Sequence, residues 1–329
     1  MTRFRLLSLL STLIALCGCS SLASPTITPT ALPPTLTPTA SVTPSPTLTP
    51  TPTPLGCLTQ PGSVTSASLS TTKPPQQFLI YLPPCYDEFP DQRYPVLYLL
   101  HGQTYTDDQW VRIGAPSVAD FMIHSGQAGP FIIVFPDDRY WNLPPGPGFG
   151  DRLLNVVIPY VDSHYRTLTD APHRALGGLS RGGGWTVHML LTQYSLFGII
   201  GLHSPVIFQD DAASLEQLVR AVPSSSWPHL WLDAGDRDGE LGNIQAFEAM
   251  LNTYEVPHEW RLYAGDHTEK YWHAHVTQYL QWYTQQFDAA GAPPPASPTT
   301  APASSATPAP SAIATLPRPA ASASATQTP

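Results

Sequence analysis

The sequence predicts an α/β domain with a mostly parallel central sheet and helices on both faces of that sheet. Three observations support this fold class. Short, continuously apolar runs, typical of strands buried on both faces, alternate with segments whose apolar residues recur at helical spacing. Gly, Pro and Asp bound most of these runs, as they do at strand ends. Polar stretches follow several runs directly, as expected where the carboxyl ends of parallel strands form a crevice.

The elements follow one another in an order typical of parallel sheets. The expected strands are Gln77–Pro83, Pro95–Gly102, Pro130–Pro136, His173–Gly178, Phe197–Ser204, His229–Gly235 and His258–Gly265. The expected helices are Asp151–Tyr165, Arg181–Tyr194, Asn243–Tyr254 and Tyr271–Phe287. Strands that alternate with helices in this way predict one sheet with its polar stretches gathered at one edge.

The N-terminal residues have the features of an export signal. Arg3 and Arg5 precede the apolar run Leu6–Leu16, which is shorter than the roughly 20 residues of a membrane-spanning helix. The segment Leu16-Cys17-Gly18-Cys19 resembles a bacterial lipobox, in which Cys19 becomes the acylated first residue. We expect residues 1–18 to be a lipoprotein-type signal peptide that leaves the protein anchored outside the cytoplasmic membrane or at the cell surface. A plain cleaved signal is the alternative.

Composition divides the rest of the chain into three parts. Residues 19–56 and 290–329 are rich in Thr, Pro, Ser and Ala, so we expect a disordered linker and a disordered tail. Residues 57–289 suit one large α/β domain. The formal charge of −9 comes with no basic stripe, so nucleic acid is not an expected partner. Nothing in the sequence demands an oligomer, and we expect a monomer.

Two cysteines remain inside the expected domain, Cys57 and Cys85. Disulfides form and persist in exported proteins, so we expect these two residues to be bonded. The bond would join the start of the domain to the end of its first expected strand. Two free thiols are the alternative.

The stretch Gly178-Leu179-Ser180-Arg181-Gly182 fits the G-x-S-x-G pattern between an expected strand and an expected helix. This pattern is typical of a sharp turn that exposes a nucleophilic serine, and its glycines remove side chains that would clash. The backbone N–H of Arg181, at the helix N-terminus, is an expected oxyanion donor. The N–H of Gln103, after His101-Gly102, is the expected second donor. His101 is expected to shape this loop and is a possible substrate contact, with simple packing as the alternative.

A serine hydroxyl needs a base to act as a nucleophile, and in this kind of site the acid and the histidine follow the serine along the chain. The stretch LDAGDRDGE offers several carboxylates, of which Asp238 lies furthest into the loop and is preferred. Asp236 is the alternative. The stretch AGDHTEKYW provides His267, whose imidazole can accept and return a proton near neutral pH.

The other histidines are less well placed for chemistry. His188 lies in the middle of the helix after Ser180 and is expected to be packed. His273 and His275 are two residues apart on a helix and do not share a face, which argues against a metal pair. We expect no metal and no organic cofactor.

Trp110, Trp141 and Trp227 lie in expected loops and could stack on a sugar or a phenolic ring. Filling of surface gaps is the alternative for each of them. The segment from Ser204 to Trp227 leaves no room for a large lid over the site. An open site suits bulky or polymer-attached esters.

The stretches YPVLYLLHG, GPGFGDRLLNVVIPYVDSHYRT, HRALGGLSRGGG, AGDRD and AGDHTEKYW together resemble the esterase D-like family of α/β-hydrolases. Bacterial feruloyl esterases resemble the chain most, and enterochelin esterases and mycolyltransferases are also similar. The resemblance covers Phe78 to Phe287. It implies the α/β-hydrolase fold, with Ser180 as nucleophile, Asp238 as the acid of a Gly-x-x-Asp turn and His267 as the base. Trp272 matches the tryptophan after that histidine and is a possible substrate contact. The family often has methionine where this chain has Arg181.

These patterns favour an exported serine carboxylesterase that cleaves an ester of the feruloyl or acyl-sugar type through an acyl-enzyme. The expected partners are a small-molecule or polysaccharide-linked ester and, through the lipid anchor, a membrane. An acyltransferase that passes the acyl group to a sugar is one alternative. A surface binding module without catalysis is another.

Overall fold

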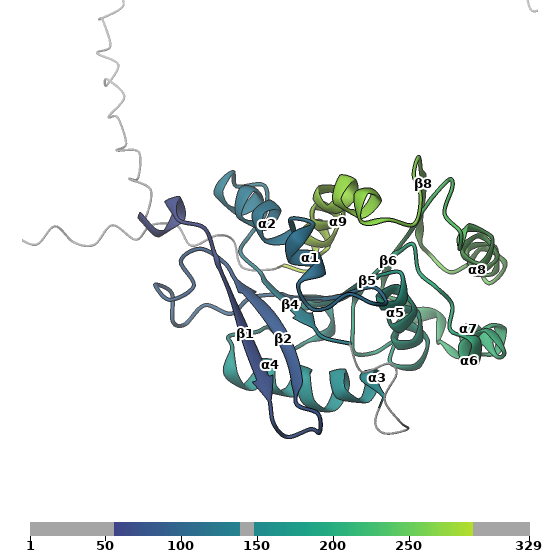
Figure 1. Ribbon diagram of the computed structural model, residues 1–329, viewed down its shortest axis with the longest axis horizontal. Helices are drawn as coiled ribbons and strands as arrows, with labels where there is room; N and C mark the ends of the chain where they lie inside the picture. Colours follow the sequence, from purple (N-terminus) through teal and green to yellow (C-terminus); the bar gives the residue numbers. More distant parts are fainter. Residues whose placement is uncertain (1–55, 139–147, 292–329) are drawn as a thin grey trace, which may run out of the picture. The chain divides into compact units, whose positions relative to one another are not determined.

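A single eight-stranded sheet forms the centre of the domain, with the strand order β1-β2-β4-β3-β5-β6-β7-β8 (Figure 1). The computed structural model describes residues 56–138 and 148–291. The strands are β1 (Ser63–Leu69), β2 (Gln76–Leu82), β3 (Val96–Leu100), β4 (Ile132–Pro136), β5 (Arg174–Leu179), β6 (Ile199–His203), β7 (His229–Gly235) and β8 (Glu259–Tyr263). β2 pairs antiparallel with both β1 and β4, and all other neighbours pair in parallel.

The helices cover both faces of the sheet (Figure 1). One apolar cluster joins the sheet to α1 (Gln109–Arg112), α2 (Ala115–His124) and α9 (Glu269–Ala289). The cluster on the other face joins it to α3 (Phe149–Arg152), α4 (Ile158–His164), α5 (Arg181–Thr192), α7 (Leu215–Ala221) and α8 (Leu241–Thr253). The short helix α6 (Gln209–Ala212) precedes α7, and a π-helical segment, Leu153–Val157, joins α3 to α4. This arrangement confirms the predicted fold class.

Several elements were not expected from the sequence, among them the short helices α1, α6 and α7. The strand β1 has the polar sequence SVTSASL and is largely exposed at the edge of the sheet, so it has no apolar run to mark it. The helix α2 lies between two expected strands and was not predicted either. The expected strands correspond to β2 through β8, in the expected order.

A disulfide joins Cys57 to Cys85, as predicted. It connects the 3-10 turn Gly56–Thr59 to the segment that follows β2. Cys19 lies outside the described residues. Within 56–138 and 148–291, no helix combines the length and the apolar composition that crossing a bilayer requires.

Candidate active site

Ser180 occupies a strained turn between β5 and α5. Its backbone has φ of 54° and ψ of −118°, a conformation that residues other than glycine rarely adopt. A Cβ atom on Gly178 would lie 2.3 Å from the carbonyl carbon and oxygen of Gly182, and one on Gly182 would lie 2.3 Å from the Leu100 oxygen. The two glycines therefore allow the close approach that this turn needs, as the G-x-S-x-G pattern predicts.

The Ser180 hydroxyl begins a continuous chain of hydrogen bonds. Its Oγ lies 2.7 Å from Nε2 of His267, and Nδ1 of the same ring lies 2.9 Å and 3.0 Å from the two oxygens of Asp238. Because a carboxylate only accepts, the imidazole proton belongs on Nδ1, and Nε2 can accept the serine proton. The His267 side chain is 27% exposed, whereas that of Asp238 is buried. The serine end of this hydrogen-bond chain is thus open to a ligand, and the aspartate end is buried.

Asp238 is held in its ionised form by its neighbours. Burial alone would raise the pKa of Asp238, but hydrogen bonds from His267 and from the Glu240 N–H at 2.8 Å lower the pKa below its usual range. The alternative carboxylate, Asp236, accepts the Gly265 N–H at 2.9 Å instead. Of the two carboxylates that the sequence left open, Asp238 is the one that contacts the imidazole.

The loop after β3 lies directly against this turn. A Cβ on Gly102 would be 3.5 Å from the Ser180 Cβ, and the Gly102 N–H donates to Oε1 of Gln109 at 2.8 Å. Gln103, the expected second oxyanion donor, follows at an exposed position. The Gln103 N–H has no hydrogen-bond acceptor within the described ranges. Arg181 is the first residue of α5, immediately after Ser180.

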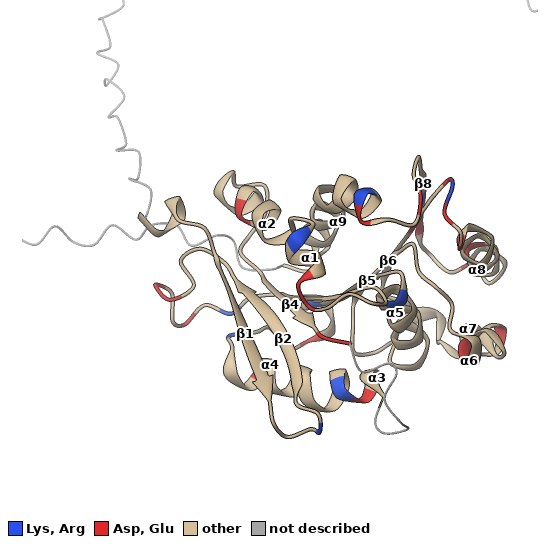
Figure 2. Ribbon diagram, in the orientation of Figure 1, with Lys and Arg blue, Asp and Glu red and all other residues tan. Residues whose placement is uncertain are grey.

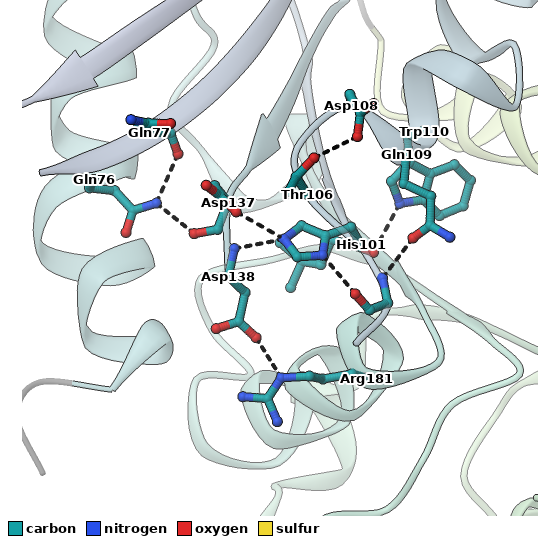
Figure 3. Close-up of polar contacts among 12 residues, drawn as sticks. Gln76, Gln77, His101, Thr106, Asp108, Gln109, Trp110, Asp137, Asp138 and Arg181 are labelled. Atoms are coloured by element: carbon teal, nitrogen blue, oxygen red, sulfur yellow. Dashed lines mark hydrogen bonds and ion pairs between the residues drawn. The ribbon is translucent and has the colours of Figure 1, made fainter. Parts of the chain in front are cut away.

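His101 is buried behind this loop and does not face a ligand, so the expectation that it is a possible substrate contact is wrong. Figure 3 shows its ring beside Asp137 and Asp138. Nε2 accepts the Asp138 N–H at 2.7 Å, so the proton lies on Nδ1, which donates to the Gly102 oxygen at 2.8 Å. The ring thereby connects the loops that follow β3 and β4, and this matches the expected role in shaping the loop.

Asp138 fixes the side chain that follows the nucleophile position. Its Oδ2 accepts a hydrogen bond from Nε of Arg181 at 2.8 Å (Figure 3). The same oxygen accepts one from Nε1 of Trp185 at 2.7 Å. Burial raises the pKa of Asp138 and outweighs the opposing effects of Arg181, Trp185 and His101. The Arg181 guanidinium is therefore held along α5 and is not free to fold over Ser180.

The tryptophans that the sequence suggested as ligand contacts have other positions. Trp110 is 1% exposed, and its Nε1 donates to the Leu100 oxygen in the core, so a stacking role for it is wrong. Trp272 is also buried, and its ring meets the His267 imidazole edge to face at 5.0 Å. Trp272 packs against the His267 ring and leaves no exposed face for a ligand. Trp227 packs against the core ahead of β7, and Trp141 lies outside the described residues.

A second histidine–aspartate pair, which the sequence analysis missed, lies behind Ser180. Nδ1 of His203 donates to Oδ1 of Asp233 at 2.7 Å, and Nε2 lies 3.0 Å from the Tyr283 hydroxyl. Asp233 also accepts hydrogen bonds from Trp231, Tyr271 and Tyr279. The signal was two polar residues at the ends of adjacent apolar strands, and their register pairing became visible only with the sheet order.

His188 was expected to be packed, and this is wrong. Its side chain is 36% exposed and its Nδ1 lies 2.9 Å from Oδ1 of Asp211. Both residues line a cleft of about 400 Å³ that begins at Arg181 and runs along α5. In the described part of the chain, no group of three or more His, Cys, Asp or Glu side chains is arranged to hold a metal ion.

Comparisons with known proteins show that the chain is similar to several esterases. A curated relative from Xylanibacter ruminicola, named endo-1,4-beta-xylanase/feruloyl esterase, is 29% identical over 198 residues, which are 57% of this chain and 26% of the relative. The chain thus spans about a quarter of that relative's length. Among solved structures, a ferulic acid esterase is 24% identical with a TM-score of 0.62, over 69% of this chain and 98% of the other. A ferulic acid esterase from Anaeromyces mucronatus, solved with ferulic acid, is 22% identical with a TM-score of 0.59, over 70% of this chain and 93% of the other.

The two structural likenesses concern the fold, which is that of the α/β-hydrolases. The family whose description is "Putative esterase" matches this chain over residues 70–283, which include every strand from β2 to β8 and the whole Ser180–His267–Asp238 chain. The protein therefore belongs to this family of esterases.

Proposed function

We propose that the protein is a serine carboxylic-ester hydrolase that works through an acyl-enzyme. The observation that carries this proposal is the unbroken hydrogen-bond chain from Ser180 to Asp238, which starts at a strained serine on an open surface. The same three side chain types in the same geometry perform acyl transfer on several unrelated folds. Membership of an esterase family agrees with this chemistry.

The proposed reaction has two halves. Ser180 Oγ attacks the ester carbonyl carbon while His267 Nε2 takes its proton, and Asp238 stabilises the imidazolium that forms. The N–H groups of Arg181 and Gln103 donate to the oxyanion of the tetrahedral intermediate. The alcohol then leaves with the proton from His267, which completes the acyl-enzyme. Water then attacks the acyl-enzyme in the same way, with His267 as the base, and the acid and free Ser180 are released.

We further propose an ester of the feruloyl or acyl-sugar type as substrate, with action outside the cytoplasmic membrane. The substrate class is supported by the relative and the structures whose names describe feruloyl and ferulic acid esterases. The location is supported by the signal-like residues 1–18 and the lipobox-like Cys19. The Cys57–Cys85 disulfide agrees with an oxidising compartment.

Labelling with a fluorophosphonate probe tests the mechanism. We expect the wild-type protein to be labelled and Ser180→Ala to remain unlabelled, with a loss of roughly 10⁶-fold in kcat on an aryl ester. An esterase screen over feruloyl, acetyl-sugar and simple aryl esters then tests the substrate class. Labelling that persists in Ser180→Ala, or a wild-type protein without any ester hydrolysis, would refute the proposal.

A further inference from the structure

The cleft along α5 begins one residue after the proposed nucleophile. We name it the α5 cleft, and Asp151, Arg181, Trp185, His188, Phe208 and Asp211 are among the residues that line it. Its walls come from segments that follow β4, β5 and β6, which end at the same edge of the sheet. Its volume of about 400 Å³ lies within the range of small-ligand sites.

The walls of the cleft are held in place by close packing. A Cβ on Gly184 would be 2.7 Å from the Phe208 ring, and a Cβ on Gly150 would be 2.7 Å from the Met189 methyl group. These two glycines let the segments after β6 and β4 lie directly on α5. The Trp185 ring is fixed by Asp138 at one end and by an edge contact with Phe208 at 5.2 Å. Such a cleft needs little rearrangement to accept a ligand.

Among the described residues of the cleft wall, Oδ2 of Asp211 lacks a hydrogen-bond partner. Asp211 is only 6% exposed, and its Oδ1 accepts a hydrogen bond from His188. Its Oδ2 is buried and has no hydrogen-bond partner in the described part of the chain. Buried polar atoms in native proteins nearly always have a partner, so this carboxylate oxygen is left to accept a hydrogen bond from water or from a ligand in the cleft.

The charged residues that line the α5 cleft indicate which class of ligand could donate a hydrogen bond to Asp211 Oδ2. Figure 2 shows acidic residues in α3 and in α6, and three of these, Asp151, Asp210 and Asp211, line the α5 cleft. Carboxylates oppose the binding of an anionic group. The described residues do not form a metal-binding cluster here. Neutral hydroxyl groups and organic cations can both donate to a carboxylate, and the aromatic ring of Trp185 in the same wall suits the apolar face of a sugar.

We propose that the α5 cleft binds the carbohydrate part of the ester, with Asp211 Oδ2 accepting a hydrogen bond from a sugar hydroxyl. This inference rests on the proposed function, since the sugar would be the alcohol that leaves Ser180. The lining residues on α5 extend from Arg181 to Gln193. At about 1.5 Å per residue they extend roughly 18 Å from the nucleophile, which suits an oligosaccharide.

The test measures sugar binding without turnover. In a Ser180→Ala background of the full chain, xylotriose and maltotriose serve as neutral pentose and hexose probes, and binding is followed by calorimetry and by tryptophan fluorescence. We expect saturable binding of at least one probe and a loss of tenfold or more in affinity when Asp211→Ala is added. Asp211→Asn keeps the shape of the side chain and serves as a second variant if Asp211→Ala fails to fold. Asp91→Asn, at an exposed carboxylate ahead of β3, is the matched control and should bind as the background protein does.

The outcomes separate this inference from the proposed function. The inference is overturned if neither sugar binds, or if both Asp211 variants keep full affinity. It is also overturned if ferulate binds in place of the sugars and its affinity depends on Asp211. Hydrolysis of a simple aryl ester by the wild-type protein reports on the proposed function alone, so each proposal can fail independently of the other.

Discussion

Two histidine–aspartate pairs lie close together in this domain, and they have the same pattern of hydrogen bonds. In the outer pair, His267 connects Asp238 to the hydroxyl of Ser180. In the inner pair, His203 connects Asp233 to the hydroxyl of Tyr283. The two are linked, because the Ser180 N–H donates to the His203 backbone oxygen at 3.1 Å.

The two pairs differ in their exposure to solvent. His203 and Asp233 are both fully buried, and Asp233 is surrounded by side-chain donors. The His267 side chain is partly exposed, and its serine sits in a strained turn at the surface. A hydroxyl–imidazole–carboxylate chain therefore does not by itself imply catalysis. Exposure of the hydroxyl and a backbone that directs it outward distinguish a reactive chain from one that supports the fold.

The sharpest test of this comparison is Asp238→Asn. We expect kcat to fall about 10⁴-fold, because the amide favours the wrong imidazole tautomer while the geometry is kept. The pKa of Asp238 is lowered in the folded protein, so the stability it contributes is present above the usual value of 3.8 and is lost as pH falls through the folded value. Kinetics on an aryl ester, with urea unfolding at neutral and acidic pH, measures both effects. A variant with wild-type kcat would contradict the proposed triad.

The inner pair should behave in the opposite way. Asp233→Ala leaves a buried imidazole and several hydroxyl groups without their acceptor, and we expect a loss of about 3–5 kcal/mol in the free energy of unfolding. The folded fraction should retain kcat close to that of the wild-type protein. Urea unfolding and active-site titration separate the two quantities. If the variant were stable but inactive, the inner pair would belong to the catalytic machinery.

Tyr283→Phe probes the inner pair more gently. The change removes one hydroxyl and leaves His203 Nε2 as a buried acceptor without a donor, which costs about 1–3 kcal/mol. Burial, with the nearby Asp233 carboxylate, raises the pKa of Tyr283 well above its usual value, so the tyrosine remains a donor at all relevant pH values. Thermal unfolding measures the loss. Tyr254→Phe, at a tyrosine that bonds to exposed Glu216, is the control and should leave the midpoint unchanged.

The smallest expected effect concerns the α5 cleft, where His188 contacts Asp211. The hydrogen bond to Asp211 raises the pKa of His188 against the effect of burial, and the charges of Asp211 and Asp151 act in the same direction. A raised histidine pKa contributes stability that is full below the ordinary value of 6.5 and is lost as pH rises through the folded value. The midpoint difference between wild type and His188→Gln should therefore shrink with rising pH. A difference that grows with pH would mean that His188 is held neutral.

Much of the outer site was accessible from the sequence because its signals are local. The glycines around Ser180 are dictated by one tight turn, and Asp238 and His267 follow two apolar strands at the same edge of the sheet. The choice between Asp236 and Asp238 could not be made from local sequence, since it depends on how the loops after β7 and β8 contact each other. The fold class followed from apolar runs, whereas the polar edge strand β1 carried no such run.

The inner pair and the α5 cleft depend on contacts between elements that are distant in the sequence, and no local pattern shows these contacts. His203 and Asp233 become neighbours only because β6 lies beside β7. His188 lines a cleft between α5 and the segments after β4 and β6, whereas periodicity alone suggested packing. Trp110 was expected in a loop, but α1 turns its ring into the core. An aromatic residue outside a strand gives no local signal of which way it faces.

The disulfide decides how the domain responds to tension. Cys57 precedes β1 and Cys85 follows β2, so both strands and the turn between them lie inside one covalent loop. A force applied to the chain ahead of Cys57 passes through the sulfur bridge to Cys85 and bypasses β1. That strand is a largely exposed edge strand held by one neighbour, so without the bridge a pull from the N-terminal side would peel it away first. A domain pulled from its N-terminal side thus keeps its sheet closed at the edge that bears the load.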